Sequence, residues 1–217
     1  MFNQQPVPQG PAEDLTTAAR IRDAAIEVFG EHGFQVGVRA IAKAAGISPG
    51  LVNHHFGSKD GLRAVCDERV LQLIREAKAK AITADSVSKG MLAAMADIEE
   101  YGPLVAYMVR SLQAGGPMAE SLLEHMISDA EVYIQAGVDA GTIKPSRDPA
   151  ARAKYLMLLN VGATVLYMQM RTQRGEKLDY RKAIRELTEE LTAPALEMYT
   201  QGLLTDPTIL DTFTKET

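Results

Sequence analysis

The chain has little of what disulfide-linked, zinc-binding or membrane-spanning proteins contain. Cys66 is the one cysteine among 217 residues, so neither an internal disulfide nor a cysteine zinc site is expected, and a reducing compartment, the cytoplasm, fits best. The longest apolar runs, 155–159 and 161–168, fall far short of the ~20 residues that span a bilayer. The N-terminus has neither a basic start nor an apolar centre. We therefore expect no membrane segment and no secretory signal.

Groups of catalytic or metal-binding side chains are also lacking. None of the four histidines has a glutamate three positions earlier, the spacing that a di-iron bundle uses. The sequence has no glycine-rich phosphate loop, and Cys66 has no evident base beside it. His54 and His55 are adjacent, but adjacent side chains on a helix diverge, which disfavours a shared metal ion. We expect no enzyme activity, no cofactor and no bound metal.

Basic residues are in the minority, since 23 Lys and Arg stand against 28 Asp and Glu. Proteins that bind DNA gain much of their affinity from Lys and Arg side chains that neutralise phosphates. A net charge of −5 is therefore unfavourable for binding DNA. The distribution is uneven, however. Residues 16–65 carry six basic and four acidic side chains, whereas residues 66–217 carry 17 basic and 22 acidic ones. This asymmetry favours a DNA-contacting head on a larger acidic body.

Residues 38–59, VRAIAKAAGISPGLVNHHFGSK, have the pattern of two short helices joined by a tight turn. One face of the first helix is apolar at helical spacing, and its members are Val38, Ile41, Ala42 and Ala45. Gly46 tolerates the positive φ that ends a helix, and Ile47 returns to the apolar face. Ser48 is expected to cap a second helix with its hydroxyl, and Pro49 suits the first helical position.

The second helix has an inward and an outward side. Val52 and Phe56 lie four residues apart and face the first helix. The outward residues are Gly50, Leu51, Asn53, His54 and His55. A helix-turn-helix of this kind lays its second helix in the major groove of DNA. The alternative is an ordinary helical hairpin within a bundle.

All later segments are also read as helical, so the expected fold class is all-α. A helix at 16–32 precedes the motif, and Ser58 is expected to cap a connecting helix that ends near residue 81. Glycine and proline breaks then separate further helices, expected at 86–101, 103–114, 117–140, 149–174 and 180–202. Residues 203–217 are expected to form short turns or a loosely packed end.

The chain therefore divides into three parts: a disordered tail at 1–14, a three-helix helix-turn-helix head at 15–60, and an all-helical body at 61–217. Lys59 falls in the first turn of the connecting helix, where the helix dipole disfavours a cation. A nearby partner would compensate, and a DNA phosphate bound with the helix amides is our hypothesis. The alternative is an ordinary surface lysine.

Three stretches, IRDAAIEVFGEHGF, VRAIAKAAGIS and HHFGSKDGL, resemble the tetracycline-repressor (TetR) family of bacterial transcriptional regulators over residues 21–62. The resemblance implies a homodimer with its heads in successive major grooves of a palindromic double-stranded DNA operator. It also implies a body cavity in which a small-molecule effector causes release of the DNA. The residues expected at the DNA are Arg39, Ser48, Pro49, Gly50, Leu51, Asn53, His54 and His55, with Lys59 on the phosphates.

Two positions depart from the family pattern. Asn53 stands where an aromatic residue is common, and its amide could instead read adenine. Gly37 stands at the cap of the first motif helix, where Thr or Ser is usual, and it offers no hydroxyl to a phosphate.

The body contains candidates for a ligand cavity and for a dimer interface. Those for the cavity are Met91, Met95, Tyr101, Tyr107, Met108, Arg110, Met126, Tyr133 and Asn160. Methionine and tyrosine favour a bulky, mostly apolar ligand, although they equally suit plain core packing. Those for the interface are Leu158, Gly162, Leu166, Met170, Ile184, Leu187 and Leu191. Two helices with such stripes form a four-helix interface in a dimer, and the alternative is packing within one chain.

Together these features predict a sequence-specific DNA-binding regulator: a repressor released from its operator by a small, largely apolar ligand. An activating or effector-independent regulator controlled by a protein partner is the alternative. A helical-bundle enzyme is disfavoured, because the sequence shows no catalytic constellation.

Overall fold

The structure, a computed structural model, describes residues 12–82, 98–172, 178–206 and 208–215. Within these ranges the chain is helical and has no strand, which confirms the all-α fold class. The elements are α1 (Ala12–His32), α2 (Val38–Ala45), α3 (Pro49–Phe56), α4 (Lys59–Ile82), the 3₁₀ helix η1 (Ile98–Tyr101), α6 (Gly102–Ala114), α7 (Gly116–Asp139), α8 (Pro149–Thr172), α9 (Tyr180–Gln201) and α10 (Thr208–Lys215). None of these described helices is both long and apolar enough to cross a membrane.

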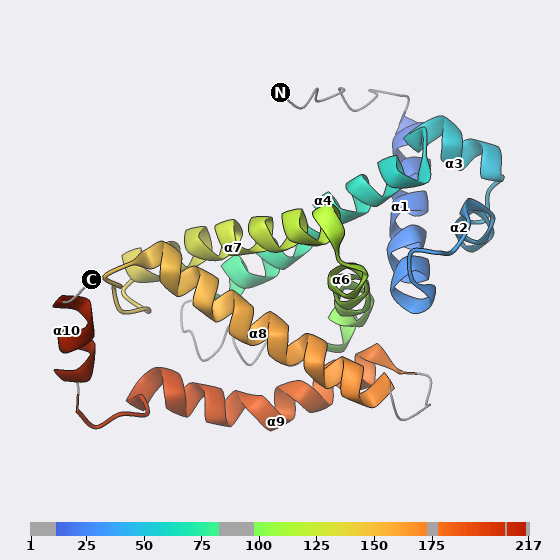
Figure 1. Ribbon diagram of the computed structural model, residues 1–217. Coiled ribbons are helices and arrows are strands. Elements are labelled where there is room, and N and C mark those ends of the chain that lie inside the picture. Colours follow the sequence, from blue (N-terminus) through green and yellow to red (C-terminus); the bar gives the residue numbers. More distant parts are fainter. Residues whose placement is uncertain (1–11, 83–97, 173–177, 207, 216–217) are drawn as a thin grey trace.

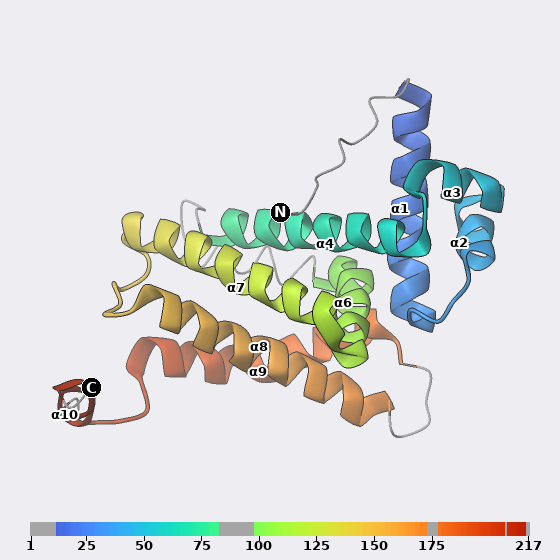
Figure 2. The same cartoon turned by 45° about the horizontal axis from the view of Figure 1, so that its top comes forward.

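Helices α1, α2 and α3 form a head at one end of the molecule, and α4 leads from the head into the body (Figure 1). In the body α7 packs between α4 and α8, and α9 lies against α8 (Figure 2). Helix α6 lies at the junction, packed against α1 of the head and against α7, α8 and α9 of the body. The head is therefore joined to the body by two helices, α4 and α6.

The head has its own hydrophobic core. Ile41 and Val52 are buried in it, as the sequence predicts, Phe29 is buried with them, and Phe34 and Phe56 pack against it partly buried. Such a cluster holds α2 and α3 in a fixed arrangement against α1, because a helix of eight residues is too short to be stable alone in water.

Residues beyond the motif complete the head core. Leu62, Cys66 and Val70 of α4 and Tyr107 of α6 are fully buried in the same cluster. The core thus reaches past residue 60, where the breaks in the sequence placed the end of the head. Burial raises the pKa of the Cys66 thiol to about 12, so the thiol is protonated at neutral pH.

Two helix ends show which capping predictions hold. Ser58 Oγ accepts a hydrogen bond from the Gly61 N–H at 2.9 Å, which confirms Ser58 as the cap of α4. Ser48 makes no side-chain cap bond to α3, so that prediction is wrong. Pro49 lies in the first turn of α3, where its missing N–H costs nothing, and Ser48 is exposed.

Three segments differ from the expected boundaries. Helix α1 begins at Ala12, so residues 12–14 are helical rather than part of a tail. Residues 208–215 form α10 where short turns or a loosely packed end were expected. Of the helix expected at 86–101, residues 98–101 form η1 and the preceding residues lie outside the described ranges.

Candidate nucleic-acid interface

The turn between α2 and α3 is fixed by Gly46, which has φ of 67°. The Gly46 N–H donates to the Lys43 carbonyl at 3.2 Å, and the Ile47 N–H donates to the Ala42 carbonyl at 2.9 Å. A residue with a Cβ is strained at this φ, so glycine makes the reversal possible. Ile47 then packs partly buried against the head core and sets the direction of α3.

Helix α3 buries Val52 and turns its other side to solvent. Ser48, Pro49, Gly50, Leu51, Asn53 and His54 are exposed there, and His55 is partly buried. The rings of His54 and His55 lie 5.4 Å apart between centroids, with 71° between their planes. Amide and imidazole groups both donate and accept hydrogen bonds, so this side of α3 is chemically suited to base edges in a major groove.

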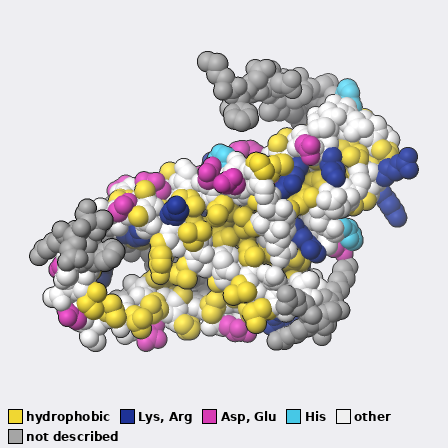
Figure 3. All heavy atoms as spheres, in the orientation of Figure 1, with side chains coloured by type: hydrophobic (Ala, Val, Ile, Leu, Met, Phe, Trp, Pro, Cys, Tyr) yellow, Lys and Arg dark blue, Asp and Glu magenta, His cyan; other side chains and the backbone are white. Residues whose placement is uncertain are grey.

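Positive charge gathers at the same end of the molecule. Arg39 and Lys43 are exposed on α2, and Figure 3 shows Lys and Arg side chains concentrated at the head. Arg20 Nη2 donates to the Ala45 carbonyl at 3.3 Å, which holds another cation beside the turn. Cations around an exposed recognition helix suit the phosphates that flank a groove.

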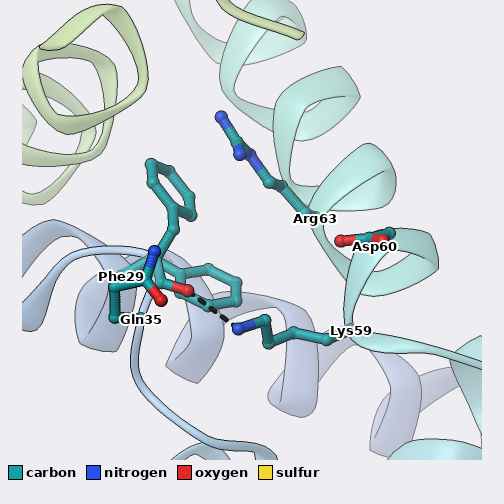
Figure 4. Close-up of a pocket in the computed structure, with 6 residues that line it drawn as sticks. Phe29, Gln35, Lys59, Asp60 and Arg63 are labelled. Carbon is teal, nitrogen blue, oxygen red and sulfur yellow. Dashed lines mark hydrogen bonds between the residues drawn. The ribbon is translucent and has the colours of Figure 1, made fainter. Parts of the chain in front are cut away.

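Lys59 has a partner within its own chain, a role that our sequence-based hypothesis gave to a DNA phosphate. Its Nζ donates to the Phe34 carbonyl at 2.8 Å and lies 3.5 Å from the Val36 carbonyl, both in the loop after α1 (Figure 4). Lys59 is partly buried at the edge of a small cavity of about 210 Å³. The guanidinium of Arg63 covers the Phe34 ring there, 3.8 Å from its centroid. A cation at this helix start is thus compensated by backbone carbonyls.

Replacing Lys59 with alanine should therefore weaken the head rather than the DNA contacts. Loss of the charged hydrogen bond is expected to lower the free energy of unfolding by about 1 to 3 kcal/mol, measured by denaturant titration. Lys43→Ala removes an exposed lysine and should change that free energy by less than about 0.5 kcal/mol. The slope of the logarithm of the DNA-binding constant against the logarithm of the salt concentration could instead fall by about one in Lys59→Ala, without loss of stability. That result would show that Lys59 contacts a phosphate.

Tyr107 connects α6 to the head. Its ring is fully buried in the head core and meets the Phe34 ring edge-on, with 5.4 Å between centroids. The Tyr107 hydroxyl donates to Asp67 Oδ1 at 2.6 Å, and the Arg63 carbonyl lies 3.3 Å away. Burial raises the pKa of the Asp67 carboxyl, and the Tyr107 hydrogen bond opposes that rise. Tyr107 is thus part of the head core and not a wall of a body cavity.

Helices α1 and α6 approach closely at Gly30. A Cβ at Gly30 would lie 2.9 Å from the Ala106 Cβ and 3.0 Å from the Tyr107 backbone nitrogen. Arg110 Nε donates to the Gly30 carbonyl at 3.4 Å. No layer of side chains separates the two helices here, so a displacement of α6 would be passed directly to α1.

A groove of about 500 Å³ lies beside this contact, between the head and the body. Its walls include Glu27 and Glu31 of α1, Pro103 and Arg110 of α6, and Tyr180 of α9. This volume is within the range of small-molecule sites in proteins. Of the residues expected to contact a ligand, Arg110 therefore lines a groove, although one at the junction rather than inside the body.

The other residues expected at a ligand cavity have different surroundings. Met108 and Met126 are buried in the body core, and the Tyr133 hydroxyl donates to Met157 Sδ at 3.4 Å. Asn160 is exposed on α8, where its Nδ2 donates to the Leu156 carbonyl at 2.7 Å. Tyr101 is partly buried in η1. Met91 and Met95 lie outside the described residues.

The stripe expected at a dimer interface is largely exposed in the protomer. Its exposed members are Leu158, Gly162, Leu166, Met170 and Leu191. Ile184 and Leu187 are instead buried in the body core, so they have no surface to offer a partner and that prediction is wrong. Tyr155, Leu159 and Tyr199 are additional exposed apolar residues of α8 and α9. In Figure 3 hydrophobic side chains spread over the face where α8 and α9 lie.

An exposed recognition helix on a three-helix head, carried by an all-helical body, defines a helix-turn-helix DNA-binding protein. Residues 21–66 match the family described as bacterial regulatory proteins, tetR family, and residues 99–205 match the tetracyclin repressor-like C-terminal domain. The chain is 51% identical over 203 residues to the HTH-type transcriptional regulatory protein RaaS of Mycobacterium tuberculosis, covering 94% of each chain. The chain belongs to the TetR family of transcriptional regulators, which are not enzymes.

More distant relatives share the head or the fold. The regulator UidR of Escherichia coli is 44% identical over 69 residues, which are 30% of this chain and 35% of UidR. A TetR-family regulator from Pectobacterium atrosepticum has a similar structure, with a TM-score of 0.56 and 22% identity, covering 92% of this chain and all of that one. FadR of Bacillus subtilis, solved with stearoyl-CoA, has a TM-score of 0.58 and 18% identity, covering 86% and 99%. At 22% and 18% identity, the likeness to these two solved structures shows the fold alone.

Proposed function

We propose that two copies of the chain bind a palindromic operator as a homodimer and repress transcription until a small, largely apolar ligand releases them. The observation that carries the proposal is the exposed side of α3, with Asn53 and His54 free of the head core. Base readout requires such a surface at the tip of a rigid head. Repression follows when the occupied operator overlaps a promoter.

Dimer formation is supported by the exposed apolar stripe on α8 and α9. An apolar face of this length is unusual on the surface of a monomer and fits a two-fold interface between identical helices. Two heads on one duplex would also compensate for the small positive charge of each head. Once one head is bound, the second binds at a high effective concentration, which raises the overall affinity.

Release by a ligand is supported by the packing at the junction. Helix α6 contributes Tyr107 to the head core and meets α1 at Gly30, and the groove lined by Arg110 lies beside both contacts. A ligand that favours a different position of α6 would therefore disfavour the DNA-bound arrangement of the heads. Stearoyl-CoA, present in the FadR structure, is a suitable first probe because it joins a long apolar acyl chain to a charged coenzyme A group.

Selection of genomic fragments with the purified protein, followed by binding titrations on the enriched sequence, tests the proposal. Asn53→Ala and His54→Ala should each weaken binding to the selected operator by about 1 to 3 kcal/mol and leave binding to unrelated DNA nearly unchanged. Glu120→Ala, an exposed change on α7, is the control and should leave both affinities unaltered. Unchanged operator affinity in both α3 variants would remove α3 as the recognition helix.

A further inference from the structure

The segment that follows α9 exposes large apolar side chains to solvent. Leu203 is 76% exposed, Leu204 is 65% exposed and Ile209, in α10, is 56% exposed. We call residues 203–206 and 208–212 the C-terminal arm. Folding alone does not explain why leucine and isoleucine occupy these positions, because side chains this exposed in the protomer contribute little burial to its stability. A cluster of this kind indicates a surface that another molecule covers.

The arm has a defined position rather than trailing from the body. Asp206 caps α10, since its Oδ1 accepts hydrogen bonds from the Thr208 N–H at 2.9 Å and from the Thr208 hydroxyl at 2.8 Å. Asp211 forms an ion pair with Arg147, in the loop between α7 and α8. Figures 1 and 2 show α10 at the end of the body that is farthest from the head. The polar contacts hold the arm to its own chain while Ile209 stays exposed.

The apolar surface of the arm continues that of the body. The last turns of α9 expose Leu196, Met198 and Tyr199, and the first turns of α8 expose Tyr155 and Leu158. These two helix ends adjoin, since Asn160 Nδ2 on α8 donates to the Tyr199 hydroxyl at 3.4 Å. Exposed apolar side chains thus run from the start of α8, across the end of α9, into the arm.

We propose that the C-terminal arm of each protomer packs on the start of α8 and the end of α9 of a second copy of this chain. The inference rests on the homodimer proposed above and adds to it a second contact, outside the pairing of the two helices. Both heads of a dimer face one duplex, so the ends farthest from the heads both lie on the side of the assembly away from the DNA. Two-fold symmetry then gives each arm the same apolar surface to cover.

Charge favours a second copy over a lipid surface. The arm carries Asp206 and Asp211, and with Lys215 at the end of α10 the segment is still net acidic, so anionic lipid headgroups repel it. The match to the family's C-terminal domain ends at residue 205. Helix α10 is therefore an addition to the region that this chain shares with the family description, and its contact would be particular to this chain and its near relatives.

Sedimentation equilibrium of the full chain is the test. The triple variant Leu203→Ser, Leu204→Ser, Ile209→Ser should raise the dimer dissociation constant at least about tenfold, because three apolar side chains lose their cover. Val132→Ser, an equally exposed apolar residue on α7, should leave that constant unchanged. Circular dichroism and thermal melting at low concentration check that each variant folds, which is expected because all four positions are exposed.

A disulfide experiment identifies the surface that the arm covers. A chain with Leu204→Cys is mixed with a chain carrying Tyr155→Cys and oxidised, and the expected product is a mixed disulfide of dimer mass that neither chain gives alone. Cys66 is buried and does not interfere. A disulfide that instead forms within one chain carrying both substitutions, with the protein monomeric, would overturn the proposal in favour of an arm folded on its own body.

The possible outcomes test the arm contact separately from the proposed homodimer. A full chain that stays monomeric at every concentration would overturn both proposals. A dimer whose dissociation constant is the same in the triple variant would overturn the arm contact alone and leave the α8 and α9 interface standing. Binding of the full chain to phosphatidylcholine–phosphatidylglycerol vesicles that the triple variant loses, with no change in dimerisation, would assign the arm to a membrane surface instead.

Discussion

Replacing Tyr107 with alanine is expected to lower the free energy of unfolding by about 3 to 5 kcal/mol, the range for removing a buried aromatic ring. The ring is fully buried and packs edge-on against Phe34, and α6 contributes no other buried residue to the head core. Because the ring joins two parts of the molecule, the variant should also lose the coupling between them. Denaturant unfolding followed by two probes, one in the head and one in the body, should give separate transitions.

Two further variants accompany Tyr107→Ala: an exposed control, and a variant that removes the hydroxyl of Tyr107 but keeps its ring. Val132→Ala removes an apolar side chain that is 66% exposed and should cost less than about 0.5 kcal/mol. Tyr107→Phe keeps the ring and removes the donor to Asp67, with an expected cost of about 1 to 3 kcal/mol. Equal stability of Tyr107→Phe and the unaltered chain would mean that the hydroxyl is not needed to satisfy the buried carboxylate.

The cost of Tyr107→Phe should depend on pH. The folded-state pKa of Asp67 is raised by burial, so protonation of Asp67 stabilises the folded protein at low pH, and this stabilisation is lost as pH rises through that pKa. The Tyr107 hydrogen bond lowers the pKa, so its removal raises the pKa further. The difference in unfolding free energy between the two proteins should therefore shrink as pH falls from about 7 to about 4. A difference independent of pH would contradict this.

Leu166→Asp should abolish specific operator binding without unfolding the protomer. Leu166 is exposed near the middle of the α8 stripe, so a carboxylate costs the single chain little. In a dimer the same carboxylate would be buried at a two-fold axis close to its symmetry mate, where two like charges repel. A monomer cannot bind two half-sites at the same time, so loss of the dimer should weaken operator binding at least about 100-fold.

Sedimentation and DNA titration measure the two parts of this effect. Val132→Asp places the same charge on an exposed apolar position of α7 and should leave the mass and the affinity unchanged. A Leu166→Asp protein that remains dimeric and binds its operator normally would show that the chain pairs through another surface.

Local patterns in the sequence predicted most of the head. Gly46, Pro49 and Ser58 act through neighbouring backbone atoms, so the turn and the starts of α3 and α4 follow from residues a few positions apart. The exposed side of α3 follows from the helical period, because Val52 fixes which side is inward.

Tertiary contacts explain what the sequence could not predict. Lys59 reaches carbonyls 25 and 23 positions earlier in the chain, and no local pattern indicates which oxygen fills that role. Tyr107 has the spacing of a body residue, but α6 turns it into the head core. The period also shows that Ile184 and Leu166 lie on apolar stripes without showing which stripe faces the protomer and which faces outward.

Cys66 gives the head a built-in reporter. Alkylating reagents attack the thiolate, and a side chain that is fully buried with a pKa of about 12 reacts only after the surrounding helices separate. The rate of alkylation therefore measures how often the domain opens, and operator DNA or an effector should slow or speed it according to which state each stabilises. Since the chain contains no other sulfhydryl, the signal comes from this site alone and needs no engineered label.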